Sequence, residues 1–297
     1  MTAQIIPVPV FDLVVFGATG DLAGRMLLPS LYALHADGLL PQLHGELIRS
    51  GAMPVQDAAV FGPSWTEIAH GAPQRLAPWW QAQAAALMAR HHCVFLGGDH
   101  SVTLPILRAM RAEHGRPLAV IHFDAHCDTW EDHFGEPSGH GTWVYEALQE
   151  GLARADCFTQ IGIRSSGVRE AREYVQDQGG QIFTARALRG LESPAQLAPM
   201  LDSIRQRLAD CGHPPLYLSL DIDCLDPAFA PGTGTPEPAG LTSNQVFTIL
   251  EELADLPFVG MDCVEVAPPY DHAELTSLVA AQLVWTYLCG RLVSQRP

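Results

Sequence analysis

The chain has 297 residues, of which 47% are hydrophobic, enough to bury one large core, and we interpret residues 1–297 as a single domain. Its formal net charge of −16 excludes the clustered basic surface that nucleic acid binding requires. Every basic side chain is arginine, which excludes mechanisms that depend on a lysine. A small cationic molecule is therefore the expected partner.

Cysteine spacing and hydropathy bear on the compartment. The seven cysteines are scattered and form no Cys-x-x-Cys pair, so we expect neither a zinc ribbon nor a disulfide framework. No apolar run is long enough to span a bilayer, and the N-terminus lacks the basic start of a cleaved signal peptide. These features predict a cytoplasmic protein with no membrane partner.

Apolar strand-like runs alternate with helical stretches along the chain. The expected strands are 13–16, 94–96, 118–123, 158–163, 216–220 and 258–264. The expected helices are 80–90, 104–113, 167–178, 195–210, 244–254 and 275–288. This alternation predicts an α/β fold with a mostly parallel sheet and helices on both faces. Functional residues are then expected at the carboxyl ends of the strands.

Two acidic runs follow apolar strands and place metal-binding side chains at alternate positions. Together with a histidine that follows another strand, the candidate metal ligands are His100, Asp124, His126, Asp128, Asp221 and Asp223. Because alternate residues of a strand point the same way, we expect these side chains to converge. Six carboxylate and imidazole ligands exceed what one zinc ion uses, and they suit a pair of manganese or related divalent ions.

Several motifs carry a family resemblance, which extends from about residue 93 to the end of the chain. They are Gly-Gly-Asp-His at 97–100, Asp-Ala-His-Cys-Asp at 124–128 and the run Ser-Leu-Asp-Ile-Asp-Cys-Leu-Asp-Pro at 219–227. These motifs resemble the ureohydrolase family, which includes arginase and agmatinase, and 160–164 and 264–271 look closest to the agmatinase branch. The resemblance implies a three-layer α/β/α arginase-like fold, two Mn²⁺ ions with Ni²⁺ or Co²⁺ as alternatives, and a homo-oligomer, either a trimer or a hexamer.

The resemblance also implies roles for individual residues. One ion would be held by His100, Asp124, Asp128 and Asp221, and the other by Asp124, His126, Asp221 and Asp223, so that Asp124 and Asp221 bridge. Water activated between the ions would attack the guanidinium carbon, with Asp128 as a hydrogen-bonding catalytic residue.

Proton transfer and substrate binding need further residues. His140 matches the proton shuttle of the family, and His133 is its rival for that role. Glu265 matches the carboxylate that receives the guanidinium, and a structural salt bridge is the alternative interpretation.

The substrate is expected to be a guanidine with a cationic tail. The loop 129–137 lacks the Asn- and Ser-containing pattern with which the arginase branch recognises its amino acid, and it carries three carboxylates that would attract an ammonium group. We therefore expect hydrolysis of agmatine to putrescine and urea. The alternatives are guanidinobutyrate, a small alkylguanidine, or a catalytically silent metal-binding homologue. The Gly-rich loop 232–240 is expected to form a wall of the pocket.

The N-terminal segment 1–45 is atypical. Residues 12–41 resemble the N-terminal strand, turn and helix of glucose-6-phosphate dehydrogenase, with glycines at 17 and 20 after an apolar strand. We favour a structural interpretation in which this unit provides the first strand and helix of the sheet. Dinucleotide binding is the alternative.

Overall fold

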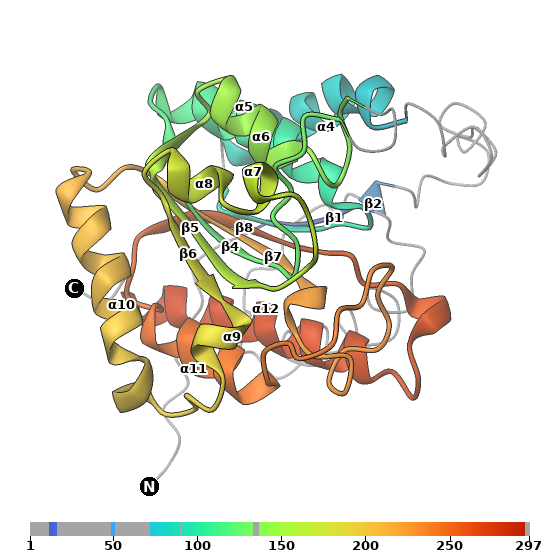
Figure 1. Cartoon of the computed structure of the whole chain (residues 1–297). Coiled ribbons are helices and arrows are strands. Elements are labelled where there is room, and N and C mark those ends of the chain that lie inside the picture. Colours follow the sequence, from blue (N-terminus) through green and yellow to red (C-terminus); the bar gives the residue numbers. More distant parts are fainter. Residues whose placement is uncertain (1–11, 17–48, 51–71, 90, 133–136, 295–297) are drawn as a thin grey trace, which may run out of the picture.

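A single parallel sheet organises the molecule. The computed structural model describes residues 12–16, 49–50, 72–89, 91–132 and 137–294 (Figure 1). The strands are β1 (Asp12–Phe16), β2 (Arg49–Ser50), β3 (Cys93–Leu96), β4 (Leu118–Phe123), β5 (Ala153–Ile163), β6 (Gln181–Thr184), β7 (Leu216–Asp221) and β8 (Phe258–Val264). They lie in the order β2-β1-β3-β8-β7-β4-β5-β6, and every neighbouring pair is parallel. All six expected strands are present, whereas β2 and β6 were not predicted.

Helices cover both faces of the sheet and complete the expected α/β/α architecture (Figure 1). One layer contains α4 (Ala72–Met88), α5 (Thr103–His114), α6 (Trp143–Gln149), α7 (Arg169–Arg172) and α8 (Tyr174–Asp177). The other contains α9 (Ala185–Leu188), α10 (Pro194–Asp210), α11 (Ser243–Glu252) and α12 (Leu275–Ser294). Short 3-10 turns follow β3, β7 and β8, namely η2 (His100–Val102), η3 (Ile222–Cys224) and η4 (Pro268–Tyr270).

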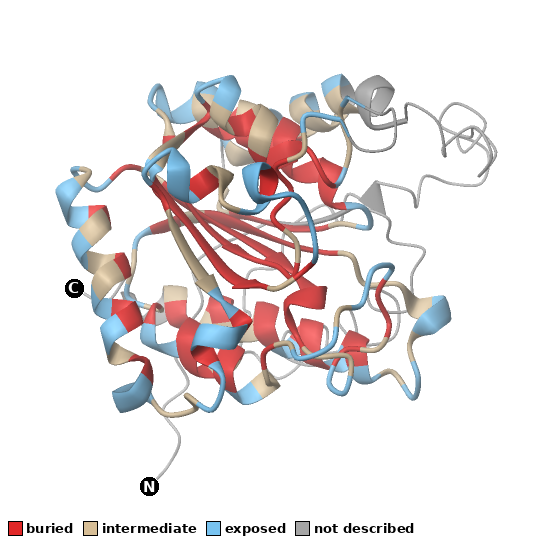
Figure 2. Cartoon of the chain, in the orientation of Figure 1, coloured by how far each residue is buried: buried red, intermediate tan, exposed pale blue. Residues whose placement is uncertain are grey.

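The central strands are largely buried on both sides, in keeping with their mostly apolar sequences. In β4, Ala119, Ile121 and Phe123 pack into the core shared with α10, α11 and α12. Leu118 and Val120 point to the opposite core, beneath α5 and α6. Every residue of β4 and β7 is buried, and the sheet forms the red centre of Figure 2. Solvent therefore reaches these strands only at their ends.

The strand order brings distant segments to one edge of the sheet. In the chain β4 follows β3, but β8 and β7 lie between them in the sheet. The segments that follow β3, β8, β7, β4 and β5 are therefore neighbours in space. Because all five strands are parallel, the residues after each of them gather at the same edge, which is where ligands bind in open α/β sheets.

One disulfide corrects the expectation from the cysteine spacing. Cys157 in β5 is bonded to Cys211 at the end of α10, 54 residues away. No local motif marks such a distant pair, so cysteine spacing alone could not reveal it. Cys93, Cys127, Cys224 and Cys263 are buried thiols outside the disulfide, as small hydrophobic residues would be.

The N-terminal strand joins the sheet. β1 pairs in parallel with β3, which agrees with the structural interpretation of the first apolar run. The glycine turn after it, 17–23, lies outside the described residues. In the part of the chain that the structure describes, no helix is both long and apolar enough to cross a membrane.

Candidate metal centre

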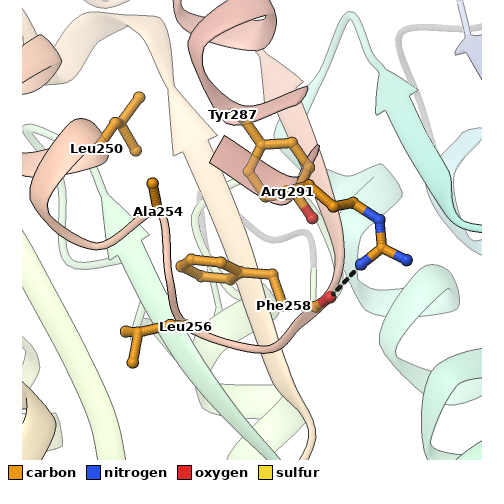
Figure 3. A pocket seen from close by; sticks show the side chains of 6 residues that line it. All are labelled: Leu250, Ala254, Leu256, Phe258, Tyr287 and Arg291. Carbon is orange, nitrogen blue, oxygen red and sulfur yellow. Dashed lines mark hydrogen bonds between the residues drawn. The ribbon is translucent and has the colours of Figure 1, made fainter. Parts of the chain in front are cut away.

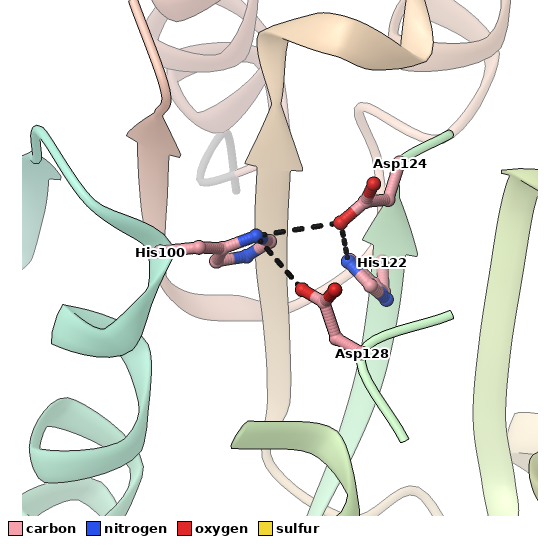
Figure 4. Close-up of side chains that lie close together, drawn as sticks. All are labelled: His100, His122, Asp124 and Asp128. Atoms are coloured by element: carbon pink, nitrogen blue, oxygen red, sulfur yellow. Dashed lines mark hydrogen bonds and ion pairs between the residues drawn. The ribbon is translucent and has the colours of Figure 1, made fainter. Parts of the chain in front are cut away.

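The first of two Asp and His clusters surrounds one nitrogen of His100. His100 Nδ1 lies 3.3 Å from Asp124 Oδ2, 3.2 Å from Asp128 Oδ2 and 3.0 Å from Asp221 Oδ2. Figure 4 shows how His100, Asp124 and Asp128 point toward one another. All four side chains are buried, and Nδ1 makes no well-oriented hydrogen bond. A buried nitrogen that faces three carboxylate oxygens fits a cation site, because buried polar groups otherwise find partners. We call these four residues the His100 cluster.

The second cluster contains His126, Asp124 and Asp223, and we call it the His126 cluster. His126 Nδ1 lies 3.0 Å from Asp223 Oδ2 and 3.3 Å from Asp124 Oδ1. Asp124 therefore directs one oxygen to each cluster. All six residues expected from the sequence are brought together, and their donor types and shared carboxylate fit two adjacent divalent ions.

Electrostatics also favours cations at this position. Burial raises the pKa of Asp221 well above its usual range, and the charges of Asp223 and Asp124 raise it further. Burial alone would lower the pKa of His126, but hydrogen bonds and charges from Asp124 and Asp223 outweigh it and raise that pKa to about 12. So many carboxylates in one buried place need compensating positive charge, which a pair of divalent ions supplies.

The metal-binding side chains that follow β4 converge because of turns in the main chain. We expected them to converge through alternate positions of a strand, and that expectation was wrong. β4 ends at Phe123, so Asp124, His126 and Asp128 lie in the loop beyond it. The Asp124 carboxylate accepts a hydrogen bond from the backbone N–H of His126. Asp128 has a φ of 52°, in the left-handed region that non-glycine residues rarely adopt. Such backbone strain is typical of functional sites.

A row of polar side chains lies in register across four strands beneath the clusters. His122 of β4 pairs with Gln160 of β5 and with Ser219 of β7, and Ser219 pairs with Asp262 of β8. All four are buried. None of the four is among the site residues expected from the sequence, since the row appears only once the strand register is known.

This polar row orients the clusters. Gln160 Nε2 lies 3.1 Å from His122 Nδ1, which leaves the Nε2–H of His122 to donate to Asp124 Oδ2 at 2.8 Å. His100 Nε2 lies 2.9 Å from Ser219 Oγ, which donates to Asp262 Oδ1 at 2.9 Å. His100 thus keeps its proton on Nε2 and turns the lone pair of Nδ1 toward the carboxylates.

Trp143, also missed from the sequence, supports the His100 cluster from α6. Its Nε1–H donates to Asp128 Oδ2 at 2.8 Å, and its ring lies 5.0 Å from that of His100. The side chain is fully buried. An aromatic residue at the start of a helix gives no signal of this role in a sequence.

A pocket of about 690 Å³ opens above the clusters. Its other lining residues include Trp130, Asp132, His140, Ser165, Glu237 and Glu265. The expected wall from the loop 232–240 is confirmed, because Thr235 and Glu237 lie in the lining. His133 and Glu136 fall outside the described residues. The volume is ample for a guanidine with a short alkyl tail.

Glu265 is held at the edge of the His100 cluster. Its Oε1 accepts the backbone N–H of His100 at 2.7 Å, and its own N–H donates to the carbonyl of Gly98 at 2.7 Å. It has a φ of 62°, again in the left-handed region. Burial raises the pKa of Glu265 to about 8, and the charge of Asp99 contributes. A cation in the pocket would favour the ionised carboxylate.

His140 lies at the mouth of the pocket and is paired with a carboxylate. Its Nδ1 lies 3.3 Å from Asp99 Oδ2, and both side chains are about half exposed. The hydrogen bond with Asp99 raises the pKa of His140 to about 9, although partial burial opposes the shift. The imidazole therefore keeps its proton at neutral pH.

A second pocket at the far end of the molecule has a different character (Figure 3). It has a volume of about 10 Å³ and is lined by Leu250, Ala254, Leu256, Phe258, Tyr287 and Arg291. Arg291 Nη1 donates to the carbonyl of Phe258 at 3.1 Å. The space holds a single water at most, so it is a packing gap and not a ligand site.

Comparisons with known proteins identify the family. Residues 49–290 match the sequence model of the arginase family. An agmatinase from Chromobacterium violaceum is 40% identical over 80% of this chain and 70% of its own length. A guanidinobutyrase from Pseudomonas aeruginosa is 42% identical over 65% of this chain and 59% of its own length. The chain belongs to the arginase, or ureohydrolase, family.

Solved structures agree with this fold. The proclavaminate amidino hydrolase of Streptomyces clavuligerus has a TM-score of 0.67 and is 37% identical, with 74% of this chain and 71% of that chain covered. The arginase of Bacillus caldovelox has a TM-score of 0.72 over 94% of this chain and 98% of that chain, at 21% identity. The expected three-layer arginase-like fold is therefore confirmed.

Proposed function

We propose that this protein hydrolyses a guanidino compound to urea and an amine, and that its substrate is agmatine. The observation that carries the proposal is the pair of Asp and His clusters that share Asp124 at the floor of the pocket. In the reaction, water adds to the guanidinium carbon and the bond from that carbon to the alkyl-bearing nitrogen breaks. Agmatine and water thus give urea and putrescine.

Two divalent ions fit the donor set, with Mn²⁺ proposed and Ni²⁺ or Co²⁺ as alternatives. The His100 cluster would hold one ion and the His126 cluster the other, with Asp124 and Asp221 as the proposed shared ligands. Of these two, Asp124 directs an oxygen to each cluster, whereas Asp221 directs Oδ2 to His100. When bound, such a pair supplies a nucleophile from water at neutral pH. The buried row beneath the clusters fixes the ligands before any ion arrives, which favours binding without rearrangement.

Glu265 and Asp128 would place the substrate. A guanidinium carries planar N–H groups that suit a carboxylate acceptor, and Glu265 is positioned in the pocket lining by the N–H of His100. Asp128 is fixed by the N–H of Trp143 on one of its oxygens. We propose that Asp128 accepts a hydrogen bond from the attacking water, so that the nucleophile and the guanidinium carbon are held in line.

His140 would protonate the leaving nitrogen. The amine is a poor leaving group unless its nitrogen gains a proton. The residue that donates this proton must itself be protonated at the working pH. The pairing with Asp99 keeps His140 in its imidazolium form at neutral pH.

Substitution of Asp99 by asparagine tests this proton donor through the pH profile. With a pKa of about 9, His140 loses its proton only as the pH rises through 9, so kcat should fall on the alkaline side from there. The Asp99→Asn substitution removes the carboxylate charge that raises the pKa of His140. The pH at which kcat falls on the alkaline side should therefore move down toward the ordinary pKa of histidine. Asparagine still accepts the N–H of Ser101, which preserves the turn.

The matched control for this profile is Asp255→Asn, which neutralises an exposed aspartate paired with Arg205 far from the pocket. It should leave the profile unchanged. An Asp99→Asn enzyme with the wild-type alkaline limb would contradict the assignment of His140 as the proton donor.

The outer pocket favours a substrate with a cationic tail. Asp132 and Glu237 line it beyond the clusters, and no arginine is among the described lining residues. A terminal ammonium would be attracted here, whereas the carboxylate of guanidinobutyrate would be repelled. This acidic lining is the specific reason for preferring agmatine over an acidic guanidine.

Urea release from a substrate series, with Mn²⁺ added, tests the proposed function. Agmatine should be turned over with a higher kcat/KM than arginine, guanidinobutyrate or propylguanidine. Glu237→Gln should raise KM for agmatine roughly 2- to 5-fold with little change in kcat, as expected for one partly exposed charge. The same substitution should also lower the ratio of kcat/KM for agmatine to kcat/KM for guanidinobutyrate.

Glu251→Gln controls for the loss of one negative charge anywhere on the protein. Glu251 is an exposed residue of α11 outside the pocket lining, so this variant should behave as wild type. Turnover of another guanidine but not agmatine would refute the substrate while preserving the chemistry. Metal binding with no urea from any guanidine would instead identify a catalytically silent homologue.

A further inference from the structure

Arg164, the residue that follows β5, makes an unusual set of contacts. Among the residues that the structure describes, its guanidinium donates only to main-chain carbonyl oxygens, at distances of 2.6 to 3.2 Å. The acceptors belong to Gly162, Asp223, Cys224, Leu225, Glu237 and Pro238. Arginine usually pairs with carboxylates, since its fixed fork matches them. Here the same fork instead gathers two separate chain segments, 223–225 and 237–238.

The main chain of Arg164 holds a third segment. Its N–H donates to the carbonyl of Ala125 at 2.9 Å, and the N–H of Ser165 donates to the same oxygen at 3.0 Å. The N–H of Ala125 in turn donates to Asp223 Oδ1 at 3.0 Å. Arg164 therefore connects the loop that carries Asp124 and His126 with the turn that carries Asp223.

These contacts act on one cluster more than on the other. Arg164 Nη2 donates at 2.8 Å to the carbonyl of Asp223, whose side chain lies 3.0 Å from His126 Nδ1. Three of the four ligands of the His100 cluster have other supports, because Ser219 holds His100, Trp143 holds Asp128 and His122 holds Asp124. Loss of the guanidinium should thus loosen the His126 cluster and leave the His100 cluster in place.

The surroundings of Arg164 leave space for its guanidinium and little else. A Cβ atom at Gly240 would lie 2.6 Å from Arg164 Nη2 and 2.5 Å from the nitrogen of Asp226. The same guanidinium fixes the main chain of Glu237, the residue whose carboxylate lines the outer pocket. One side chain therefore sets both a metal ligand and a substrate wall.

We propose that Arg164 is a positioning residue. It holds Asp223 in place for the ion of the His126 cluster, and it holds the main chain of Glu237 in the pocket wall. The inference rests on the proposed function, because it assumes a site for two ions. It predicts an asymmetric defect, in which only one of the two ions is bound more weakly.

Titration of the metal-free full chain with Mn²⁺, followed by calorimetry and by the EPR signal of free Mn²⁺, provides the test. Wild type should bind two ions. Arg164→Met should bind the first ion with an affinity close to that of wild type, and the dissociation constant of the second should rise roughly 10- to 100-fold, the usual effect of losing a ligand-supporting contact. Arg164→Lys should lie between them, since an ammonium offers three donors without the planar fork.

Two variants make the result specific. Asp223→Ala should weaken the same ion, and Arg207→Met should leave both ions unchanged, because Arg207 donates to the carbonyls of Asp156 and Gly179 at the other end of the molecule. If Arg164→Met fails to fold, Arg164→Lys decides. Wild-type affinity for both ions, or equal weakening of both, in the folded variant would overturn the role of Arg164. Fewer than two ions in wild type would overturn the proposed function as well.

Discussion

Replacement of Asp124 by asparagine is expected to lower kcat/KM for guanidine hydrolysis by roughly 10³-fold, the largest effect of any single change in the pocket. Asp124 presents one oxygen to His100 Nδ1 and the other to His126 Nδ1. An amide has only one oxygen, so its NH₂ group must face one of the two clusters. The substitution removes a charge and also places donors where a cation needs an acceptor. Urea release at saturating Mn²⁺ measures the loss.

The control for this loss is Asp156→Asn, at an exposed aspartate that pairs with Arg154 on the protein surface. It should retain wild-type activity. Circular dichroism should show an unchanged fold for both variants, because the amide oxygen introduced in Asp124→Asn still accepts one hydrogen bond from His122 or His126. Activity of Asp124→Asn within tenfold of wild type would rule out a shared carboxylate at the centre of the mechanism.

Replacement of Glu265 by glutamine is expected to lower kcat/KM by roughly 10²-fold while both ions remain bound. Hydrogen bonds to a charged group contribute about 1.5–3 kcal/mol, and the amide would turn an NH₂ group toward the N–H groups of the substrate. The Oε1 of glutamine can still accept the N–H of His100, so the local structure should persist. Steady-state kinetics with agmatine, together with metal content, provides the measurement.

This substitution separates the two interpretations of Glu265. A glutamate that only forms a structural salt bridge would leave kcat/KM unchanged, or would alter stability without a specific kinetic effect. Glu150→Gln, which removes the exposed carboxylate partner of Arg108, serves as the matched control and should behave as wild type. Loss of an ion from Glu265→Gln would point to metal positioning and away from substrate binding.

Much of the fold follows from local sequence. β4 and β7 are buried on both faces, so their sequences are mostly apolar and are recognised as strands without tertiary information. α10 starts with Ser193 and Pro194, and Gln196 completes its capping box. β6 escaped prediction because it has four residues, lies at an edge and is only partly buried. The Cys157–Cys211 bond depends on tertiary contacts that no local pattern records.

The candidate site also has some features that the sequence predicts and others that it does not. The types and spacing of the acids and histidines are local properties, so the amino-acid sequence alone is enough to recognise them as a metal-binding set. The contacts among Gln160, His122, Ser219 and Asp262 depend on the register of four strands, which the sequence does not contain. The role of Arg164 depends on where two loops meet, and arginine at a strand end carries no such signal.

The number of ions bound per chain tests the central claim most directly. Metal-free protein is loaded with Mn²⁺, freed of excess ion by gel filtration and measured by elemental analysis, with Asp124→Asn treated in parallel. Two Mn²⁺ per wild-type chain, and at most one in Asp124→Asn, are the predicted values. One ion or none in wild type would contradict a dinuclear site built around Asp124, and with it the proposed hydrolysis.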